Sequence, residues 1–351
     1  MTLRLHPPAH SVPDNVWHTL WISIFASWFV WQTGEDLIEL FTGSLPVTFF
    51  ELRLLQGEGS AFQTWLNAFG GEDYPLLPGR ILALVGWFLA LAQVIRFLKP
   101  HNGFVGSLPS LLILFTLPGF SVWMSAAGSA SWSVYFFIKG FEAISHNETK
   151  VPIIRGGVFV GIALLLHGIW LLPIIGLLMG CWEVFRYRLN WAVIGMVAVV
   201  LPLGLVLVVF DPDALARMIP GGSLQGELGF GGWGGLFSRY LLLVVSLLLL
   251  LVYGARRRGA GWWSLAFTMP LLVLEPLLAS GPETVLLPLW IFVALGLSKV
   301  PTLLDVRFPR AYQSVVLCQL LLWAPAYLGT QPLKIYPPVT PDIEQYSFSH
   351  D

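Results

Sequence analysis

Apolar runs long enough to cross a bilayer recur from one end of the chain to the other. A helix needs about 20 consecutive apolar residues to cross the hydrocarbon core of a membrane. The chain is 56% hydrophobic and only 11% charged, so it has too few polar side chains to cover a surface that faces water. The sequence therefore predicts an all-α, polytopic transmembrane protein. The clear runs are 17–33, 81–98, 108–124, 191–210, 237–254, 262–279 and 311–329, and the weaker ones are 131–145 and 284–297.

Residues 156–182 fit either one long helix or two short helices broken near Gly168 and Pro173. Two short spans give about eleven spans in all, with the N-terminus in the cytoplasm. The cytoplasmic segments then hold thirteen of the 19 Lys and Arg residues, the outer segments five, and a span the remaining Lys139. This is the positive-inside bias of membrane proteins. A single span would put Arg155 and Arg186 on opposite sides, so the charges favour two spans.

We expect residues 1–351 to form a single transmembrane domain with two long outer loops. The first loop, 34–80, contains short amphipathic stretches typical of interfacial helices. The second loop, 211–236, is rich in glycine. The cytoplasmic loops are short, so any chemistry is expected on the outer face. The net charge of −1 gives no indication of a nucleic-acid partner, and Cys181 and Cys318 are interpreted as small buried apolar residues.

Glu35 and Asp36 follow the first predicted span directly. Two adjacent carboxylates at a membrane surface can act as a general base or hold a divalent cation. Partial desolvation raises the pKa of such a carboxylate, which suits proton abstraction from a sugar hydroxyl. The alternative is an acidic cap on a short interfacial helix over 37–41, where carboxylates favour the helix dipole.

Asp73, Tyr74 and Arg80 lie just before the second predicted span. Arg80, expected at the lipid boundary, could bind a phosphate through two parallel hydrogen bonds. The alternative is an arginine whose long side chain reaches from the lipid to the membrane surface.

His167 is predicted near the outer end of its span. An ionisable group inside an apolar run is a candidate for function. A lone histidine is, however, more often a hydrogen-bonded core residue. Lys139, Glu142 and Glu275 are further ionisable residues within or beside spans, and they show no obvious pairing.

In order along the chain, these features resemble the polytopic GT-C glycosyltransferases, of the protein mannosyltransferase and aminoarabinose transferase type. Glu35-Asp36 matches the place of the family's catalytic acid after the first span. Residues 74–77 (Tyr-Pro-Leu-Leu), followed by Gly79-Arg80, are similar to the stretch that leads into the family's second span. Residues 161–168 resemble a later family motif, with His167 where a Lys or Arg is usual. The acid that the family has before its fourth span is replaced by 128–131 (Gly-Ser-Ala-Ser).

The resemblance implies a donor sugar on a polyprenyl phosphate, transferred with inversion on the extracytoplasmic face of the bacterial inner membrane. Asp36 or Glu35 would be the catalytic base. Arg80 and His167, with Asp73 and Tyr74 nearby, would bind the substrate. The sequence demands no cofactor, although a divalent metal could be held by the acidic pair, and membrane proteins are possible further partners.

Two other functions remain open at the level of sequence. A non-catalytic scaffold subunit of a larger membrane complex predicts that Glu35, Asp36 and Arg80 face different directions. A lipid or solute transporter predicts ionisable groups near the middle of the membrane and a path open to the cytoplasm.

Overall fold

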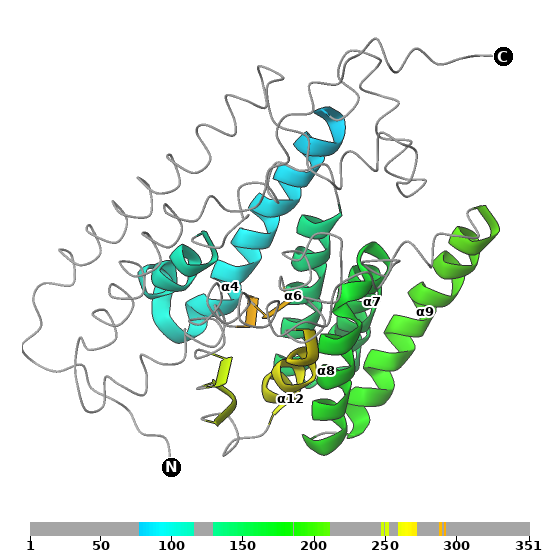
Figure 1. Ribbon diagram of the computed structural model, residues 1–351. Helices are drawn as coiled ribbons and strands as arrows, with labels where there is room; N and C mark the ends of the chain where they lie inside the picture. Colours follow the sequence, from blue (N-terminus) through cyan, green and yellow to red (C-terminus); the bar gives the residue numbers. More distant parts are fainter. Residues whose placement is uncertain are drawn as a thin grey trace, which may run out of the picture.

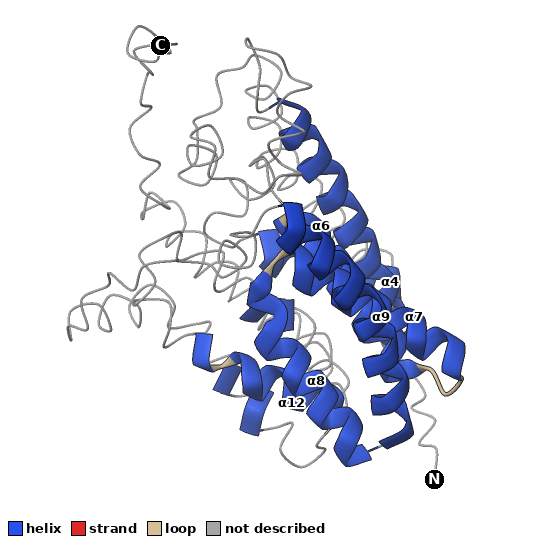
Figure 2. Cartoon of the chain, turned by 90° about the vertical axis from the view of Figure 1, so that its right-hand side faces the viewer, coloured by secondary structure: helices blue, strands red, loops and turns tan. Residues whose placement is uncertain are grey.

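The computed structural model describes residues between 77 and 292, with gaps. All the regular structure within these residues is helical, and Figure 2 draws no strand among them. The described residues are 77–115, 129–184, 186–210, 247–248, 250–252, 259–271, 288–289 and 291–292. The helices are α4 (Leu77–Phe115), α6 (Ala130–His146), α7 (Lys150–Leu166), η1 (Gly168–Trp170), α8 (Leu171–Val184), α9 (Arg186–Phe210) and α12 (Ala260–Thr268).

The segment that the sequence left ambiguous is broken, as the charges favoured. Helix α7 ends at Leu166, His167 has an extended backbone (φ −156°, ψ 110°), and the short 3₁₀ helix η1 leads into α8. The break near Gly168 is confirmed. Pro173 lies just after this break, in the first turn of α8, where a missing backbone N–H costs nothing.

Helix α4 corrects two expected boundaries. It begins at Leu77, so the last four residues of the predicted outer loop 34–80, Arg80 among them, belong to the helix. It also continues to Phe115 through the loop expected between residues 98 and 108. Figure 1 shows the helix bending sharply in its later part, which contains Pro100 and Pro109. Proline removes a helical hydrogen bond and is a usual cause of such bends.

Helices α4 and α6 run in the same direction. Near their starts, the Trp132 indole Nε1 donates to the carbonyl oxygen of Leu82 at 3.0 Å. Near the end of α6, the His146 ring stacks on Phe97 at 5.3 Å between centroids. The straight first part of α4 and the whole of α6 are therefore parallel neighbours, as two spans that both enter from the outer side would be.

Helix α7 returns antiparallel to α6, since Ser129 at the start of α6 contacts Leu166 at the end of α7. The chain then passes back through α8, so that α9 lies parallel to α7. Helix α12 lies beside α8 and antiparallel to it, with Gly180 against Ala260 and Gly176 against Ser264. Figure 2 shows α8 and α12 side by side. These relative directions agree with the topology derived from the charges.

Two ends of the described bundle can now be named. The Arg80 end holds the starts of α4 and α6 and the link between α7 and α8. The basic end holds the end of α6, the starts of α7, α9 and α12, and the end of α8. The described basic side chains near it are Arg96, Lys150, Arg155, Arg186 and Arg188. Figure 1 shows the Arg80 end at the top and the basic end at the bottom.

The α6–α7 and α8–α9 connections are tied together at the basic end. The Arg188 Nη1 donates to the carbonyl oxygen of Ser145 at 2.7 Å. The Lys150 ammonium lies 4.9 Å from the Trp191 ring centroid. Arg155 and Arg186 thus share one end, which is the arrangement that two short spans require.

Helices α7 and α9 approach closely through glycine. A Cβ added to Gly157 would collide with the backbone of Ala192, and one added to Gly195 would collide with the backbone of Ile154. Small residues at an interface let two membrane helices come together over a large van der Waals contact, which is their main attraction in lipid. This pair therefore depends on the absence of side chains at two positions.

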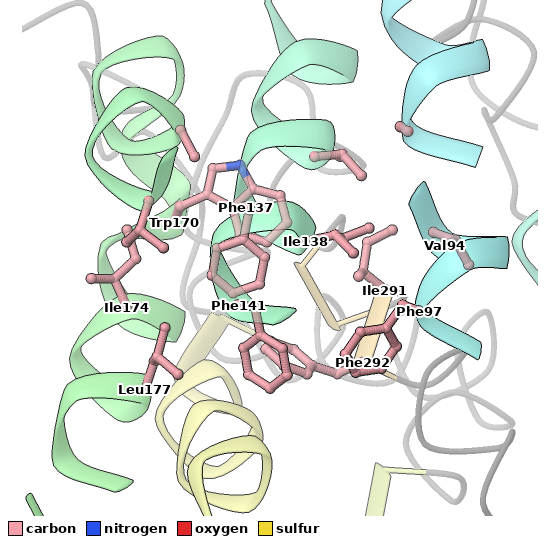
Figure 3. Close-up of a cluster of buried hydrophobic side chains, with 14 of the residues drawn as sticks. Val94, Phe97, Phe137, Ile138, Phe141, Trp170, Ile174, Leu177, Ile291 and Phe292 are labelled. Carbon is pink, nitrogen blue, oxygen red and sulfur yellow. The ribbon is translucent and has the colours of Figure 1, made fainter. Parts of the chain in front are cut away.

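A buried aromatic and aliphatic cluster joins α4, α6, α8 and residues 291–292 (Figure 3). Trp170 and Phe137 stack at 4.2 Å, and Phe292 meets Phe137 and Phe141 edge-on. Aromatic pairs in these geometries add to the dispersion energy of a close-packed interior. The cluster holds the α7–α8 link against the middle of α6.

Two described helices are long and apolar enough to cross a membrane, namely Leu77–Phe97 within α4 and Arg186–Val206 within α9. They differ in their surroundings, because half of the α4 segment is buried in the protein and only 11% of the α9 segment is. The exposed side chains of α9 include Leu201, Leu205 and Val209. Such a bare apolar face is suited to contact with lipid.

Candidate functional site

Arg80 occupies the first turn of α4, and its side chain is buried, with an exposed fraction of 6%. It shares the inward face of the helix with Ala83 and Trp87, at helical spacings of three and seven residues. The alternative of a side chain that reaches from the lipid to the membrane surface is therefore not supported. Arg80 faces the protein interior, and the binding of an anion stays a prediction from the sequence.

The first turn of α6 lies directly beside this part of α4. Trp132 donates to Leu82, which follows Arg80 by two residues, or about 3 Å along the helix axis. Ser131 packs against Gly86, where an added Cβ would collide with the Ser131 Oγ. The buried Ser131 Oγ has no hydrogen-bond partner, although its exposed fraction is only 1%.

The link between α7 and α8, which contains His167, contacts the same turn of α6. Leu166, the neighbour of His167, accepts a 2.7 Å hydrogen bond from Ser129 Oγ, and the Trp170 indole Nε1 donates to Ser133 Oγ at 2.8 Å. His167 lies between these two contacts. Its ring Nδ1 is buried and has no partner among the described residues, so the interpretation of His167 as a fully hydrogen-bonded core residue is not supported. An unpaired buried polar atom is costly and indicates a missing partner.

The start of α6 is also an uncapped helix N-terminus. Ser129 stands at the N-cap but makes no side-chain cap, because its hydroxyl binds Leu166, and the first turn carries no acidic residue. The first N–H groups of a helix have no partner within it and attract anions. The sequence interpretation missed this feature. The signal was present in residues 129–133 (Ser-Ala-Ser-Trp-Ser), a serine-rich start of a helix.

The structure therefore places two of the predicted site residues at one end of the bundle. Arg80 on α4 and His167 on the α7–α8 link lie at the end of the bundle where α6 begins, because Leu82 and Leu166, close to them in sequence, contact Trp132 and Ser129. The other four, Glu35, Asp36, Asp73 and Tyr74, lie outside the described residues, as does the second predicted loop, 211–236. The described half of the site has cationic and hydrogen-bonding groups that suit a phosphate.

The ionisable groups within α6 are separately engaged. Gln93 on α4 donates its side-chain amide to the Glu142 carboxylate, and Lys139 donates to the Tyr135 hydroxyl at 2.9 Å. Glu275, the other candidate named from sequence, lies outside the described residues. No line of ionisable groups across the bundle is found in the described helices, which gives the transporter interpretation no support from them.

Metal ligands do not cluster in the part of the chain that the structure describes, where no three His, Cys, Asp or Glu side chains lie together. Cys181 is free and buried within α8, as the interpretation of a small apolar residue predicted.

No protein-family model matches the sequence of this chain. Nor does any curated protein match it in sequence.

The fold, in contrast, has clear relatives among solved structures. The crystal structure of ArnT from Cupriavidus metallidurans bound to undecaprenyl phosphate matches with a TM-score of 0.54 and 15% identity, over 90% of this chain and 65% of that one. The apo structure of the same enzyme matches with a TM-score of 0.53 over the same shares. ArnT is an aminoarabinose transferase, a GT-C glycosyltransferase and a polytopic membrane protein. The chain thus has a GT-C-like fold, as its sequence resemblance implied, and it spans about two thirds of ArnT.

Proposed function

We propose that this protein is a membrane glycosyltransferase of the GT-C type. It takes a sugar from a polyprenyl-phosphate donor and transfers it, with inversion, to an acceptor on the extracytoplasmic face of the bacterial inner membrane. About eleven spans, with the N-terminus in the cytoplasm, carry the site. The observation that carries the proposal is that Arg80 and His167 both lie at the end of the bundle that holds the uncapped start of α6, in a fold shared with an enzyme crystallised with undecaprenyl phosphate.

The charge distribution supports the direction of this site. The described basic side chains Arg96, Lys150, Arg155, Arg186 and Arg188 gather toward the end opposite Arg80. Basic residues of membrane proteins concentrate on the cytoplasmic side. The Arg80 end is accordingly the extracytoplasmic end, where a lipid-linked sugar in the outer leaflet would be reached.

The reaction is a single displacement. Asp36, or Glu35 beside it, removes the proton from the acceptor hydroxyl as that oxygen attacks the anomeric carbon of the sugar. The bond from the anomeric carbon to the phosphate oxygen breaks, and the polyprenyl phosphate leaves with the electron pair. Attack opposite the leaving group inverts the anomeric centre.

Arg80 and His167 stabilise the leaving phosphate. The charge on its oxygens grows as the bond breaks, and preorganised donors in a site shielded from water stabilise such charge strongly. Arg80 offers a planar fork of N–H groups. His167 offers the buried Nδ1, when this atom carries the proton, and the uncapped N-terminus of α6 lies at the same end of the bundle. Asp73 and Tyr74 complete the sugar-binding side.

The test is turnover with a panel of undecaprenyl-phosphate sugars, measured as release of undecaprenyl phosphate from the purified protein in lipid nanodiscs. We expect one donor to be consumed, and Asp36→Asn to abolish its consumption without changing the melting temperature. Glu35→Gln is the matched control for the identity of the base. If Asp36→Asn and Glu35→Gln each keep full activity, neither carboxylate is the catalytic base. An inert protein that binds no undecaprenyl phosphate contradicts the enzyme altogether and favours the scaffold function.

A further inference from the structure

Lys139 is a lysine near the middle of an apolar membrane helix, nine residues after the start of α6. Charged side chains within membrane segments are costly, and they are usually paired or placed beside a polar group. The proposed glycosyl transfer gives Lys139 no role, because the residues of its site lie at the end of the bundle. The contacts of this side chain therefore need a separate explanation.

The Lys139 ammonium is held by aromatic side chains and not by an acid. It donates to the Tyr135 hydroxyl at 2.9 Å, and it lies 5.1 Å and 4.6 Å from the ring centroids of Tyr135 and Phe159. The closest acid in sequence, Glu142, instead accepts from Gln93. Within the described residues, no carboxylate makes an ion pair with Lys139. An ammonium has three N–H groups, so two remain for a ligand.

Three aromatic side chains extend from Lys139 toward the start of α6. We call Trp132, Tyr135 and Phe136, together with Phe159 of α7, the α6 aromatic stripe. Neighbouring rings are in contact, with centroids 6.2 Å apart for Trp132 and Phe136 and 5.9 Å apart for Phe136 and Phe159. All four rings and Lys139 are partly exposed, so the stripe lies at the protein surface. A lipid chain can reach a surface of this kind.

The direction of the side chain brings the charge toward the Arg80 end. Long side chains on a helix lean toward its N-terminus. Lys139 does so, because its hydrogen-bond partner Tyr135 lies one turn earlier, about 6 Å nearer the start of α6. The ammonium is thus drawn from the middle of the span toward the depth of lipid headgroups on one side.

We propose that Lys139 and the α6 aromatic stripe bind an anionic phospholipid, with its phosphate on the ammonium and a chain along the rings. Cation–π contact with two rings offsets only part of the cost of a partly desolvated ammonium. A phosphate oxygen supplies the missing opposite charge, as in the basic pockets between membrane helices that bind lipid headgroups. Bulk phospholipid is the ligand at highest local concentration beside a surface that faces the bilayer. This site is distinct from the proposed donor site, and it does not depend on catalysis.

Lipid retention tests this proposal. The purified protein, with residual lipid removed by detergent exchange, is mixed with phosphatidylglycerol, phosphatidylcholine or undecaprenyl phosphate, and bound lipid is counted by native mass spectrometry. We expect about a fivefold preference for phosphatidylglycerol over phosphatidylcholine. Lys139→Met removes this preference and Lys139→Arg keeps it, so a folding defect in the first variant does not decide the result. Lys150→Met is the matched control, because Lys150 also lies over an aromatic ring but at the basic end, and it leaves the preference unchanged.

Three results would overturn the site. Lys139→Met could retain phosphatidylglycerol as the unchanged protein does, or Lys150→Met could lose it equally. A Lys139-dependent preference for undecaprenyl phosphate alone would assign the lysine to the donor and not to a phospholipid. If the unchanged protein retains phosphatidylglycerol but transfers no sugar, the result counts against the proposed glycosyl transfer and leaves the lipid site standing.

Discussion

The indole Nε1 of Trp170 donates a 2.8 Å hydrogen bond to the hydroxyl oxygen of Ser133. This bond joins η1 to the first turn of α6, and both residues are completely buried. Ser133 in turn donates to the carbonyl oxygen of Ala130 at 2.6 Å, so its hydroxyl is fully committed. The bond fixes the α7–α8 link on α6, and with it the position of His167.

Ser133→Ala is expected to destabilise the protein by about 1 kcal/mol, because the buried Trp170 N–H would lose its acceptor. The matched control is Ser131→Ala, two residues earlier in the same turn. The Ser131 hydroxyl is equally buried but has no partner, so its removal should leave stability unchanged or improve it. Thermal unfolding of both variants in the same detergent measures the difference. Equal effects would show that the Trp170 bond contributes nothing.

Gly157→Ala and Gly195→Ala are each expected to destabilise the α7–α9 pair by about 1–3 kcal/mol. The added methyl group has no room against the facing backbone, so the helices must move apart. Gly204 provides the control on α9 itself, because a Cβ added there meets nothing. Gly204→Ala should be neutral or stabilising, since alanine is the better helix former. Unfolding in detergent of graded denaturing strength compares the three variants.

Labelling from the two sides of the membrane tests the proposed orientation. In a background of Cys181→Ala and Cys318→Ala, single cysteines replace Thr149, Arg186 or Asp73. Thr149 and Arg186 are exposed at the basic end, and we expect a membrane-impermeant maleimide to label them in inverted vesicles only. Asp73→Cys should react in intact spheroplasts. Labelling of Thr149→Cys and Arg186→Cys from opposite sides would contradict the break at His167.

Arg80→Lys is expected to lower kcat/KM for the lipid donor by roughly 10- to 100-fold, since a hydrogen bond to a charged group contributes about 1.5–3 kcal/mol. Lysine keeps the charge but loses the planar fork that binds two phosphate oxygens. Steady-state kinetics measure the loss. Arg96→Lys, an exposed arginine at the other end of the straight part of α4, should retain full activity. A similar loss in both variants would remove Arg80 from the site.

Charge and hydropathy predicted the helices over 131–145 and 191–210 and the relative directions of the described helices, whereas the predicted spans 17–33 and 311–329 lie outside the described residues. The break between α7 and α8 followed from the requirement that Arg155 and Arg186 share a side, and the structure has it one residue from Gly168. The boundaries at α4 were less predictable. A proline marks a bend as readily as a loop, so Pro100 could not tell a loop from a bent helix.

Burial and partners of single side chains could not be predicted, because they depend on contacts between residues far apart in the chain. Arg80 at a span boundary suits both the lipid surface and the protein interior, and only the packing of the folded chain decides between them. The contact of Trp132 with Leu82 and that of Gln93 with Glu142 each join residues about 50 positions apart. No local pattern records such pairs. The acidic half of the site, Glu35 and Asp36, remains a prediction from sequence.

Helix α9 combines a strongly apolar composition with very little burial, and its main neighbour α7 meets it across a seam of glycines. Such a helix can partition into the bilayer by itself, since its side chains need no shelter and its backbone lacks only the hydrogen bond that Pro202 cannot donate. Packing of α9 against α7 is then a later step, driven by van der Waals contact between the helices and not by the hydrophobic effect. The chain thus separates insertion from assembly at this helix, and a misfit in the seam would leave α9 inserted but undocked, available to pair with another copy.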